Sequence, residues 1–467
     1  MINHGLLLDG IHPIMMNVLI FLLKDGVTMN MNKKLLPIIM GCVLIGTAAQ
    51  ALAAEYYLAP NGSDSGNGSK SAPWKSFARA QQTLSPGDRL WVRGGTYTFT
   101  AGLNSCASQT DIVNAITLNK SGTSGKRIEY VAYTGETPVF DFSQMKDDCR
   151  VKGFNVVADW VTLKGLEIKG VPQNNNKNHE SWGVWIKGSN NRFEQLDIHH
   201  IMGTGLFLQN GANNTVLNSD SHHNYDPLTS NGAGQSGDGF GAHIAANMPG
   251  NIFSGCRAWS NSDDGFDLIN AYSSVTIENS WAWSHGYLPG TTTSLAAGNG
   301  NGFKAGGYGA KYISNAPKHI VRNSVAFLNK AAGFYANHHP VANDFFNNTS
   351  YRNAVNFSMR GIDENGNAIA LGTLRNNISY AAKSQSLAYT DGANMRYNSW
   401  NYSNVISDAE FQSVSTTGWD APRQADGSLP VLKHLRLATD SWMIDKGGDV
   451  KIAYQGAAPD LGAFELK

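Results

Sequence analysis

The sequence predicts an all-β protein, most simply a right-handed parallel β-helix in which short strands wind into stacked coils. The first observation is a glycine followed by a large apolar residue, repeated inside short strand-like segments. These pairs are Gly183-Val184, Gly205-Leu206, Gly239-Phe240, Gly265-Phe266, Gly302-Phe303 and Gly333-Phe334, with Asn356-Phe357 as a degenerate seventh. The second observation is an Asn-rich, strand-like segment upstream of each pair, with no stretch of helical period between the two.

The spacing of the repeat explains why these strands must stack. The shortest interval, from Gly183 to Gly205, is 22 residues, and the longer intervals are the same coil with loops inserted. A coil of this length cannot bury its apolar face alone, whereas stacked coils form a continuous core. Asparagine suits the turns because it tolerates left-handed conformations and can bond to the same residue one coil away. A propeller or sandwich is the alternative, but its repeats would be longer or would lack the constant Gly–apolar strand.

A short helix is predicted to cap the N-terminal end of the solenoid. Helical spacing relates Trp74, Phe77, Ala78, Gln81 and Leu84. The pattern stops at Pro86-Gly87-Asp88, where proline and glycine favour a turn. The terminal coil of a solenoid needs a cap of this kind because its core would otherwise face water.

Composition excludes several classes of protein. The chain has 467 residues, with 36 basic and 36 acidic side chains, 15% charged residues and 50 glycines. A formal net charge of zero argues against a nucleic-acid-binding protein. The low charge and abundant glycine also argue against a coiled coil and a disordered tail.

The N-terminal region predicts export. Residues 31–53 have the layout of a signal peptide: a basic start at Lys33-Lys34, an apolar run and the small-residue site Ala51-Leu52-Ala53. Residues 1–30 are interpreted as an upstream mis-start, and residues 54–467 as the mature β-helix domain. The apolar runs are too short to span a membrane, so we expect a secreted protein, extracellular or periplasmic.

Three cysteines remain after the expected cleavage. Cys106 and Cys149 lie in polar, loop-like sequence and could form a disulfide in an oxidising compartment. Cys256 lies in an apolar-alternating segment and is interpreted as a small buried hydrophobic residue.

Aligning the strands on their glycines places polar residues in columns. The outward position two residues after each glycine reads Trp185, Phe207, Gly241, Asp267, Lys304, Tyr335 and Ser358. The position before the glycine reads Asp238, Asp264 and Asn301 in the central coils, and Asp263 precedes Asp264. Equivalent residues of neighbouring coils lie roughly 4.8 Å apart. The sequence therefore gathers four aspartates on two adjacent coils, with Lys304 on the next.

The aspartate cluster predicts a metal site. Four carboxylates this close repel one another unless a cation keeps them ionised. The cluster gathers only oxygen ligands, which favours Ca²⁺ over Zn²⁺. The alternative is that Asp-Gly pairs are ordinary turns, but these pairs fall in register on successive coils.

Lys304 has two interpretations. It could form a salt bridge to Asp267, or act as a general base, because nearby positive charge favours its neutral form. A cation bound to the carboxylate of a uronate sugar would acidify the hydrogen on C5. Loss of that hydrogen with the C4 glycosidic oxygen breaks the chain by β-elimination, without the paired acids of a glycoside hydrolase.

At these positions the sequence resembles polysaccharide lyase family 9, the secreted bacterial pectate lyases. The resemblance extends to residues 56–62, Pro86-Gly87-Asp88, residues 94–97 and residues 460–465. It implies that Asp238, Asp263, Asp264 and Asp267 hold calcium and that Lys304 is the catalytic base. Because the family also includes enzymes that act on rhamnogalacturonan, the polymer is left open.

We therefore expect a secreted, monomeric, calcium-dependent pectate lyase that acts on polygalacturonate or pectin and leaves unsaturated ends. His243, Tyr335 and Arg360 are candidate substrate-binding residues, although each could be an ordinary surface residue. The alternatives are a lyase for another uronate polymer such as rhamnogalacturonan or alginate, a hydrolase, and a non-catalytic binding or adhesion protein stiffened by calcium.

Overall fold

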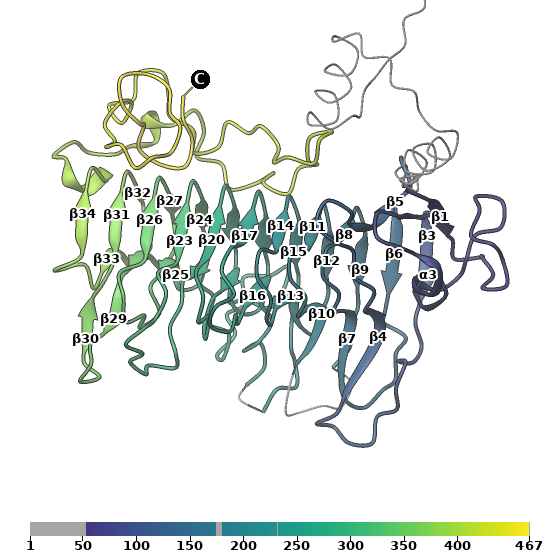
Figure 1. Cartoon of the computed structure of the whole chain (residues 1–467). Helices are drawn as coiled ribbons and strands as arrows, with labels where there is room; N and C mark the ends of the chain where they lie inside the picture. Colours follow the sequence, from purple (N-terminus) through teal and green to yellow (C-terminus); the bar gives the residue numbers. More distant parts are fainter. Residues whose placement is uncertain (1–52, 174–179, 231, 467) are drawn as a thin grey trace, which may run out of the picture. The chain divides into compact units, whose positions relative to one another are not determined.

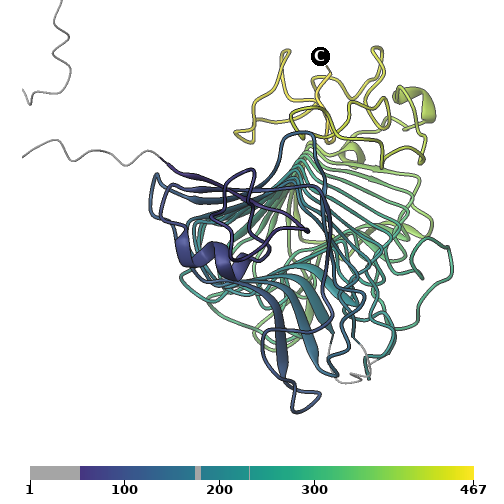
Figure 2. The ribbon, with the colours of Figure 1, turned by 90° about the vertical axis from the view of Figure 1, so that its right-hand side faces the viewer.

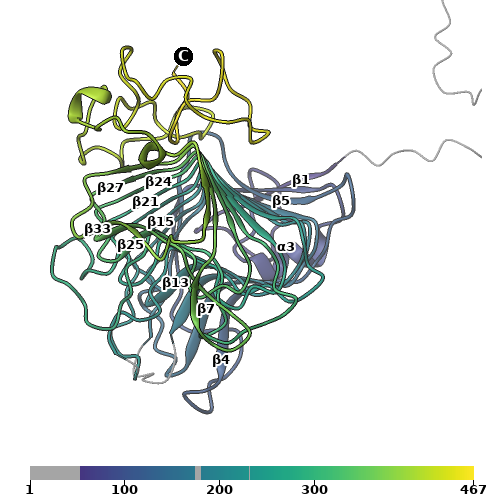
Figure 3. The same ribbon diagram turned by 90° about the vertical axis from the view of Figure 1, so that its left-hand side faces the viewer.

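The computed structural model describes residues 53–173, 180–230 and 232–466, which form a right-handed parallel β-helix (Figure 1). Three parallel sheets run along the solenoid, and its coils lie one behind another around a shared interior (Figures 2 and 3). The predicted fold is confirmed. The proposed mis-start and all of the proposed signal peptide except Ala53 lie outside the described residues.

Each sheet takes strands from successive coils. Sheet 1 has the order β1 (Glu55–Leu58), β2 (Arg89–Val92), β5 (Ile128–Ala132), β8 (Val161–Lys164), β11 (Arg192–Glu194), β14 (Thr215–Leu217), β17 (Asn251–Ser254), β20 (Val275–Glu278), β23 (Ile320–Arg322), β26 (Asp344–Phe346), β31 (Thr373–Arg375) and β34 (Asn394–Arg396). Sheet 2 has the order β4 (Ile112–Leu118), β7 (Arg150–Val156), β10 (Ser181–Ile186), β13 (Gly203–Leu208), β16 (Phe240–Ala242), β19 (Phe266–Asp267), β22 (Phe303–Lys304), β25 (Ala332–Tyr335), β28 (Val355–Ser358) and β33 (Gln385–Ala388). Sheet 3 has the order β3 (Gly95–Thr98), β6 (Pro138–Asp141), β9 (Glu167–Lys169), β12 (Asp197–His199), β15 (Asp220–His222), β18 (Arg257–Trp259), β21 (Trp281–Trp283), β24 (Val325–Phe327), β27 (Thr349–Tyr351) and β32 (Ile378–Tyr380). An antiparallel pair, β29 (Arg360–Ile362) and β30 (Ala368–Ala370), follows β28 along the chain.

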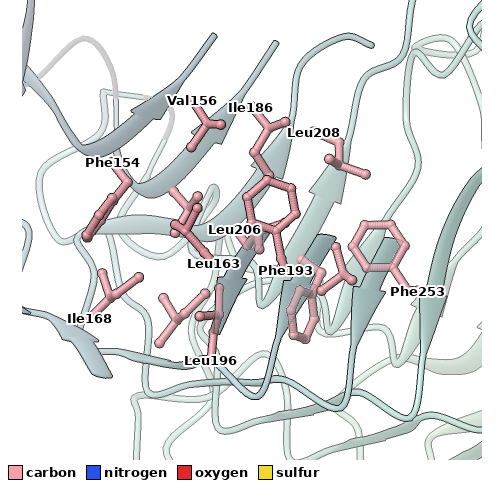
Figure 4. Packing of buried hydrophobic residues seen from close by; sticks show 14 of the residues in the cluster. Phe154, Val156, Leu163, Ile168, Ile186, Phe193, Leu196, Leu206, Leu208 and Phe253 are labelled. Carbon is pink, nitrogen blue, oxygen red and sulfur yellow. The ribbon is translucent and has the colours of Figure 1, made fainter. Parts of the chain in front are cut away.

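The residue after each repeated glycine points into the core, as predicted. One register position of sheet 2 is occupied by Val184, Leu206, Phe240, Phe266, Phe303, Phe334 and Phe357. From Phe240 to Phe357 the rings stack, with centroids 4.9 to 5.0 Å apart. Gly153-Phe154 belongs to the same ladder, because Phe154 pairs with Val184, although it is not among the predicted pairs. Side chains from sheets 1 and 3, including Phe193, Phe253 and Ile168, fill the remaining interior (Figure 4).

Glycine precedes these rings because a side chain would have no room. A Cβ on Gly265 would lie 2.6 Å from the carbonyl oxygen of Gly302 and 2.6 Å from Nε2 of His285. A Cβ on Gly239 would lie 2.7 Å from the carbonyl oxygen of Gly265. Close-packed interiors leave no space to relieve such contacts, so glycine allows the coils to stack this tightly.

Asparagine ladders hold the turns. The backbone N–H of Asn191 donates to Oδ1 of Asn214 at 3.0 Å, and the N–H of Asn214 donates to Oδ1 of Asn251 at 3.1 Å. The turns from sheet 1 to sheet 3 are short, and their first residue is often left-handed, as at Asn218 (φ 49°) and Asn279 (φ 50°). The connections into sheet 2 are longer, notably those from β15 to β16 and from β21 to β22.

The predicted capping helix is present as α3 (Phe77–Thr83). Its N-cap is Ser76, whose hydroxyl accepts the backbone N–H of Arg79 at 3.1 Å. Phe77 is buried against Phe154 of sheet 2, with ring centroids 5.7 Å apart, while Ala78 is exposed. The helix therefore covers the first coils of the core.

The chain after β34 leaves the solenoid and packs on its outside (Figure 1, yellow). It contains two 3₁₀ turns, η1 (Ser399–Asn401) and η2 (Asp408–Glu410), and is otherwise irregular. Its Trp419 packs on Trp281 and Phe327 of sheet 3, with ring centroids 4.6 and 4.7 Å apart. This segment thereby buries an aromatic outer face that would otherwise be exposed to water.

Cys106 and Cys149 form a disulfide, which the sequence left open. Cys256 is free and buried, as predicted. Across residues 53–173, 180–230 and 232–466, no helix has both the length and the hydropathy to cross a membrane.

Candidate active site

The predicted outward column lies in register on sheet 2. Successive strands pair Trp185 with Phe207, Phe207 with Gly241, Gly241 with Asp267, Asp267 with Lys304, Lys304 with Tyr335 and Tyr335 with Ser358. Because parallel pairing stacks equivalent residues, Lys304 sits one coil beyond Asp267.

Three aspartates form a compact buried group beside this column. Oxygen atoms of Asp238, Asp263 and Asp264 lie within 4.8 Å of one another, and all three side chains are buried. Asp238 precedes β16, and the other two precede β19, so neighbouring coils supply them. Asp267, the fourth predicted ligand, is not part of this compact group.

Hydrogen bonds fix the carboxylates in place. Oδ1 of Asp238 accepts the backbone N–H of Asp264 at 3.1 Å, which links the two coils. Oδ1 of Asp264 accepts both the backbone and the side-chain N–H of Asn301, at 2.7 and 2.8 Å. Oδ1 of Asp263 accepts the backbone N–H of Asn299 at 2.6 Å. The loop that leads into β22 therefore helps to position the group.

Lys304 reaches the same group of acids. Its Nζ lies 3.0 Å from Oδ2 of Asp264 and 3.0 Å from Oδ2 of Asp267, and the residue is only 7% exposed. Burial alone would lower the pKa of Lys304, but the carboxylates of Asp264, Asp267 and their neighbours outweigh burial and raise it well above its usual range. In this arrangement Lys304 is an ammonium ion that partly balances the acids.

The single positive charge of Lys304 does not balance the carboxylates of Asp238, Asp263 and Asp264. Burial raises the pKa of Asp238 and Asp263 well above the usual range, and the neighbouring carboxylates raise it further. Burial also raises the pKa of Asp264, although Lys304 opposes this. A cation among these oxygens would remove the repulsion. The donor set contains only oxygen, so the residues fit a hard divalent metal ion.

A pocket of about 360 Å³ opens above Lys304 on the outer side of sheet 2. Its lining consists of Arg150, Glu180, Trp182, Trp185, Thr204, Phe207, Gln209, Gln235, Ser236, Asp238, His243, Asp263, Asp267, Ile269, Asn299 and Lys304. Asp238, Asp263, Asp267 and Lys304 therefore face a space that a ligand can enter, while Asp264 lies buried behind them.

An aromatic and basic patch borders the pocket on the N-terminal side. Trp182, Trp185 and Phe207 form a cluster, and Trp185 stacks on Phe207 with ring centroids 5.1 Å apart. Arg150 Cζ lies 3.9 Å from the ring of Trp182, and Lys152 Nζ lies 4.1 Å from the ring of Trp185. Burial, with help from Lys187 and Arg150, lowers the pKa of Lys152 to about 8.

The basic part of this patch was missed by sequence reasoning, although a signal was present. Arg150 and Lys152 belong to β7, which carries the further pair Gly153-Phe154. Extending the repeat one coil towards the N-terminus would have put both residues on the strand beside Trp185.

The three candidate substrate-binding residues lie at different distances from the pocket. His243 lines it, and its ring centroid lies 4.7 Å from that of Phe207. Tyr335 pairs with Lys304 in the sheet. Arg360 does not line the pocket; it lies on β29, with Cζ 5.1 Å from the ring of Tyr389.

Similarity to known proteins extends over most of the chain. Residues 56–377 match the family described as "Pel9A-like, right handed beta helix region". The chain belongs to this family. The resemblance to polysaccharide lyase family 9 is thereby confirmed.

Individual relatives agree with this assignment. Pectate lyase L of Dickeya chrysanthemi is 39% identical over 88% of this chain and 90% of its own length. Pectate lyase PEL9 of Emericella nidulans is 31% identical over 81% of this chain and 91% of its own. The crystal structure of pectate lyase Pel9A matches with a TM-score of 0.74 and 36% identity, over 89% of this chain and 97% of that one. A rhamnogalacturonan lyase matches with a TM-score of 0.75 and 33% identity, over 83% and 97%.

Proposed function

We propose that this chain is a calcium-dependent pectate lyase that cleaves polygalacturonate by β-elimination and leaves 4,5-unsaturated ends. The observation that supports it most is the buried aspartate group in contact with Lys304 at the floor of the sheet 2 pocket. The names of the relatives support the same activity.

Asp238, Asp263 and Asp264 would hold the calcium ion, with Asp267 beside them. When bound, the ion would offset the charge of a uronate carboxylate and so acidify the hydrogen on C5. The carboxylates that hold the ion are the same groups that raise the pKa of Lys304. Because a bound cation would offset these carboxylates, it would lower the pKa of Lys304 and so favour loss of the Lys304 proton.

In this mechanism Lys304 accepts the C5 proton as a neutral amine. The C5–H bond breaks and its electron pair forms the C4=C5 double bond. The C4–O glycosidic bond breaks, and the oxygen leaves with the electron pair of this bond and takes a proton from water to become a hydroxyl group. Lys304 is suitably placed because its Nζ borders both the carboxylates and the pocket. Proton transfer by a positioned side chain contributes about 10²- to 10⁴-fold to a rate.

The aromatic and basic patch would hold the polymer next to this centre. The parts of Trp185 and Phe207 that line the pocket offer apolar surface to a sugar ring. Arg150 and Lys152 offer positive charge to uronate carboxylates. His243 and Tyr335 would contact sugars nearer Lys304. Arg360, on β29 and outside the pocket lining, would contact only a longer polymer chain.

A rhamnogalacturonan lyase is the second candidate function. It is supported by the solved rhamnogalacturonan lyase, whose TM-score of 0.75 is as high as that of pectate lyase Pel9A. Both candidates use elimination from a uronate, so they differ in the sugars next to the cleaved bond and not in the chemistry at Lys304.

We also propose that the protein is exported, with residues 31–53 as the signal peptide. The Lys33-Lys34 start, the apolar run and Ala51-Leu52-Ala53 support export, as does the Cys106–Cys149 disulfide, because disulfides persist in oxidising compartments. N-terminal sequencing of protein recovered outside the cytoplasm should begin at Ala54. Retention of an intact N-terminus inside the cell would contradict export.

Purified protein should generate UV-absorbing oligosaccharides from polygalacturonate in calcium-containing buffer. A chelator should stop the reaction and added Ca²⁺ should restore it, because the aspartate group needs a cation. A parallel panel of rhamnogalacturonan and alginate identifies the preferred polymer. Cleavage that persists in chelator, products without unsaturation, or binding without cleavage would each contradict the proposal.

Lys304→Met should lower kcat by at least about 100-fold at saturating Ca²⁺, because it removes the base. The exposed Lys311 provides a matched control, and Lys311→Met should keep normal activity. Circular dichroism and calcium titration should show that both variants fold and bind Ca²⁺. Near-normal turnover of folded Lys304→Met would exclude Lys304 as the base.

Trp185→Ala should raise KM for polygalacturonate roughly tenfold, equivalent to about 1.4 kcal/mol, with a smaller change in kcat. The reason is that Trp185 borders the pocket without touching Lys304 in the sheet ladder. Trp91→Ala, on β2 of sheet 1, is the control and should leave KM unchanged. An unchanged KM in Trp185→Ala would remove this patch from the substrate path.

A further inference from the structure

A cluster of four histidines lies on sheet 3, on a different sheet from the candidate active site. It consists of His199 and His200 at the end of β12, and His222 and His223 at the end of β15; we call it the histidine patch. The rings of His199 and His222 stack with centroids 5.0 Å apart, and those of His200 and His223 with centroids 5.5 Å apart. The two pairs therefore lie one above the other on adjacent coils.

The fold brings each pair together by a left-handed turn. His199 and His222 are paired in the parallel ladder. The residue after each strand is left-handed, with φ 54° at His200 and φ 55° at His223, which brings its ring beside that of the preceding histidine. As a result, Nδ1 of His199 lies 2.6 Å from Nδ1 of His200, and Nδ1 of His222 lies 2.7 Å from Nδ1 of His223.

Carboxylates contact the opposite side of two of these rings. Nε2 of His199 lies 3.3 Å from Oε1 of Glu167, and Nε2 of His222 lies 3.0 Å from Oδ1 of Asp197. A carboxylate partner favours the tautomer with the proton on Nε2, which leaves the lone pair on Nδ1. Metal-binding histidines commonly donate their second N–H to a carboxylate in this way.

His199, His200 and His223 are also in the charge state that binds metals. Burial lowers the pKa of His199 and His200, and neighbouring imidazoles add to this effect at His200. Burial, together with the other histidines, lowers the pKa of His223 to about 4. These rings are therefore neutral at pH 7, and neutral imidazole is the form that coordinates a metal ion.

We propose that the histidine patch binds a divalent transition-metal ion such as Zn²⁺, Cu²⁺ or Ni²⁺ through its paired Nδ1 atoms. Imidazole nitrogen suits these ions, whereas the oxygen-only aspartate group suits a hard cation. The ion would replace the contact between the two Nδ1 atoms of a pair, which must move apart by roughly 0.7 Å to bind a tetrahedral Zn²⁺ with Zn–N distances of about 2.0–2.1 Å. The chain would then have two cation sites of different chemistry on different sheets.

Isothermal titration of the full chain with ZnCl₂ at pH 7, in excess Ca²⁺, tests the proposal. Wild type should bind Zn²⁺, and the double variant His200→Asn, His223→Asn should lose at least about tenfold in affinity. Asparagine keeps the left-handed turns because it tolerates positive φ. His338→Asn is a matched control, since His338 also has φ 55° but lies outside the patch, and it should bind Zn²⁺ like wild type.

Two further measurements test whether the metal ion binds to the histidine patch or to other side chains of the protein. The variant Glu167→Gln, Asp197→Asn should weaken Zn²⁺ binding by about 10- to 100-fold, because it removes the carboxylates that orient the rings. Electron paramagnetic resonance of the Cu²⁺ form should show nitrogen hyperfine splitting in wild type that the double histidine variant loses. Absence of Zn²⁺ binding, unchanged binding by the histidine variant, or a Cu²⁺ spectrum with oxygen ligands alone would overturn the proposal.

Discussion

The candidate site depends on the parallel hydrogen-bonded register between successive coils of sheet 2. This register stacks Asp267 on Gly241 and Lys304 on Asp267, so residues far apart in sequence become neighbours. The register is held from within by the stacked phenylalanines and by glycines that leave no room for a side chain. A slip of one residue would turn Lys304 into the core and a phenylalanine into the pocket.

Much of this could be predicted because the repeat encodes register directly. Aligning the chain on Gly239, Gly265 and Gly302 was enough to place the aspartates and Lys304 on one side of adjacent coils. The alignment could not give the burial of Lys304 or its contacts with both Asp264 and Asp267. Those features depend on side-chain conformations and on the loop before β22, whose length and path follow no period.

Two other features were not predicted, for different reasons. The segment after β34 has no repeating pattern, so nothing in it indicated that Trp419 would cover the aromatic outer face of sheet 3. The contribution of β7 was encoded, since Gly153-Phe154 continues the ladder, but its outward residues are basic and not acidic. The column of acidic residues therefore gave no indication of the strand that supplies Arg150 and Lys152.

The turns divide the coil into a constant part and a variable part. Between sheets 1 and 3 the chain turns within two residues in every coil but the one that connects β5 to β6, with a left-handed asparagine at positions such as Asn218 and Asn279. The longer connections enter sheet 2, beside the pocket. Insertions or deletions in these loops change the lining of the pocket, while the spacing between stacked coils stays the same. The same scaffold can thus accommodate different polymers when its loops change, because the hydrogen-bonded register between coils is unaffected.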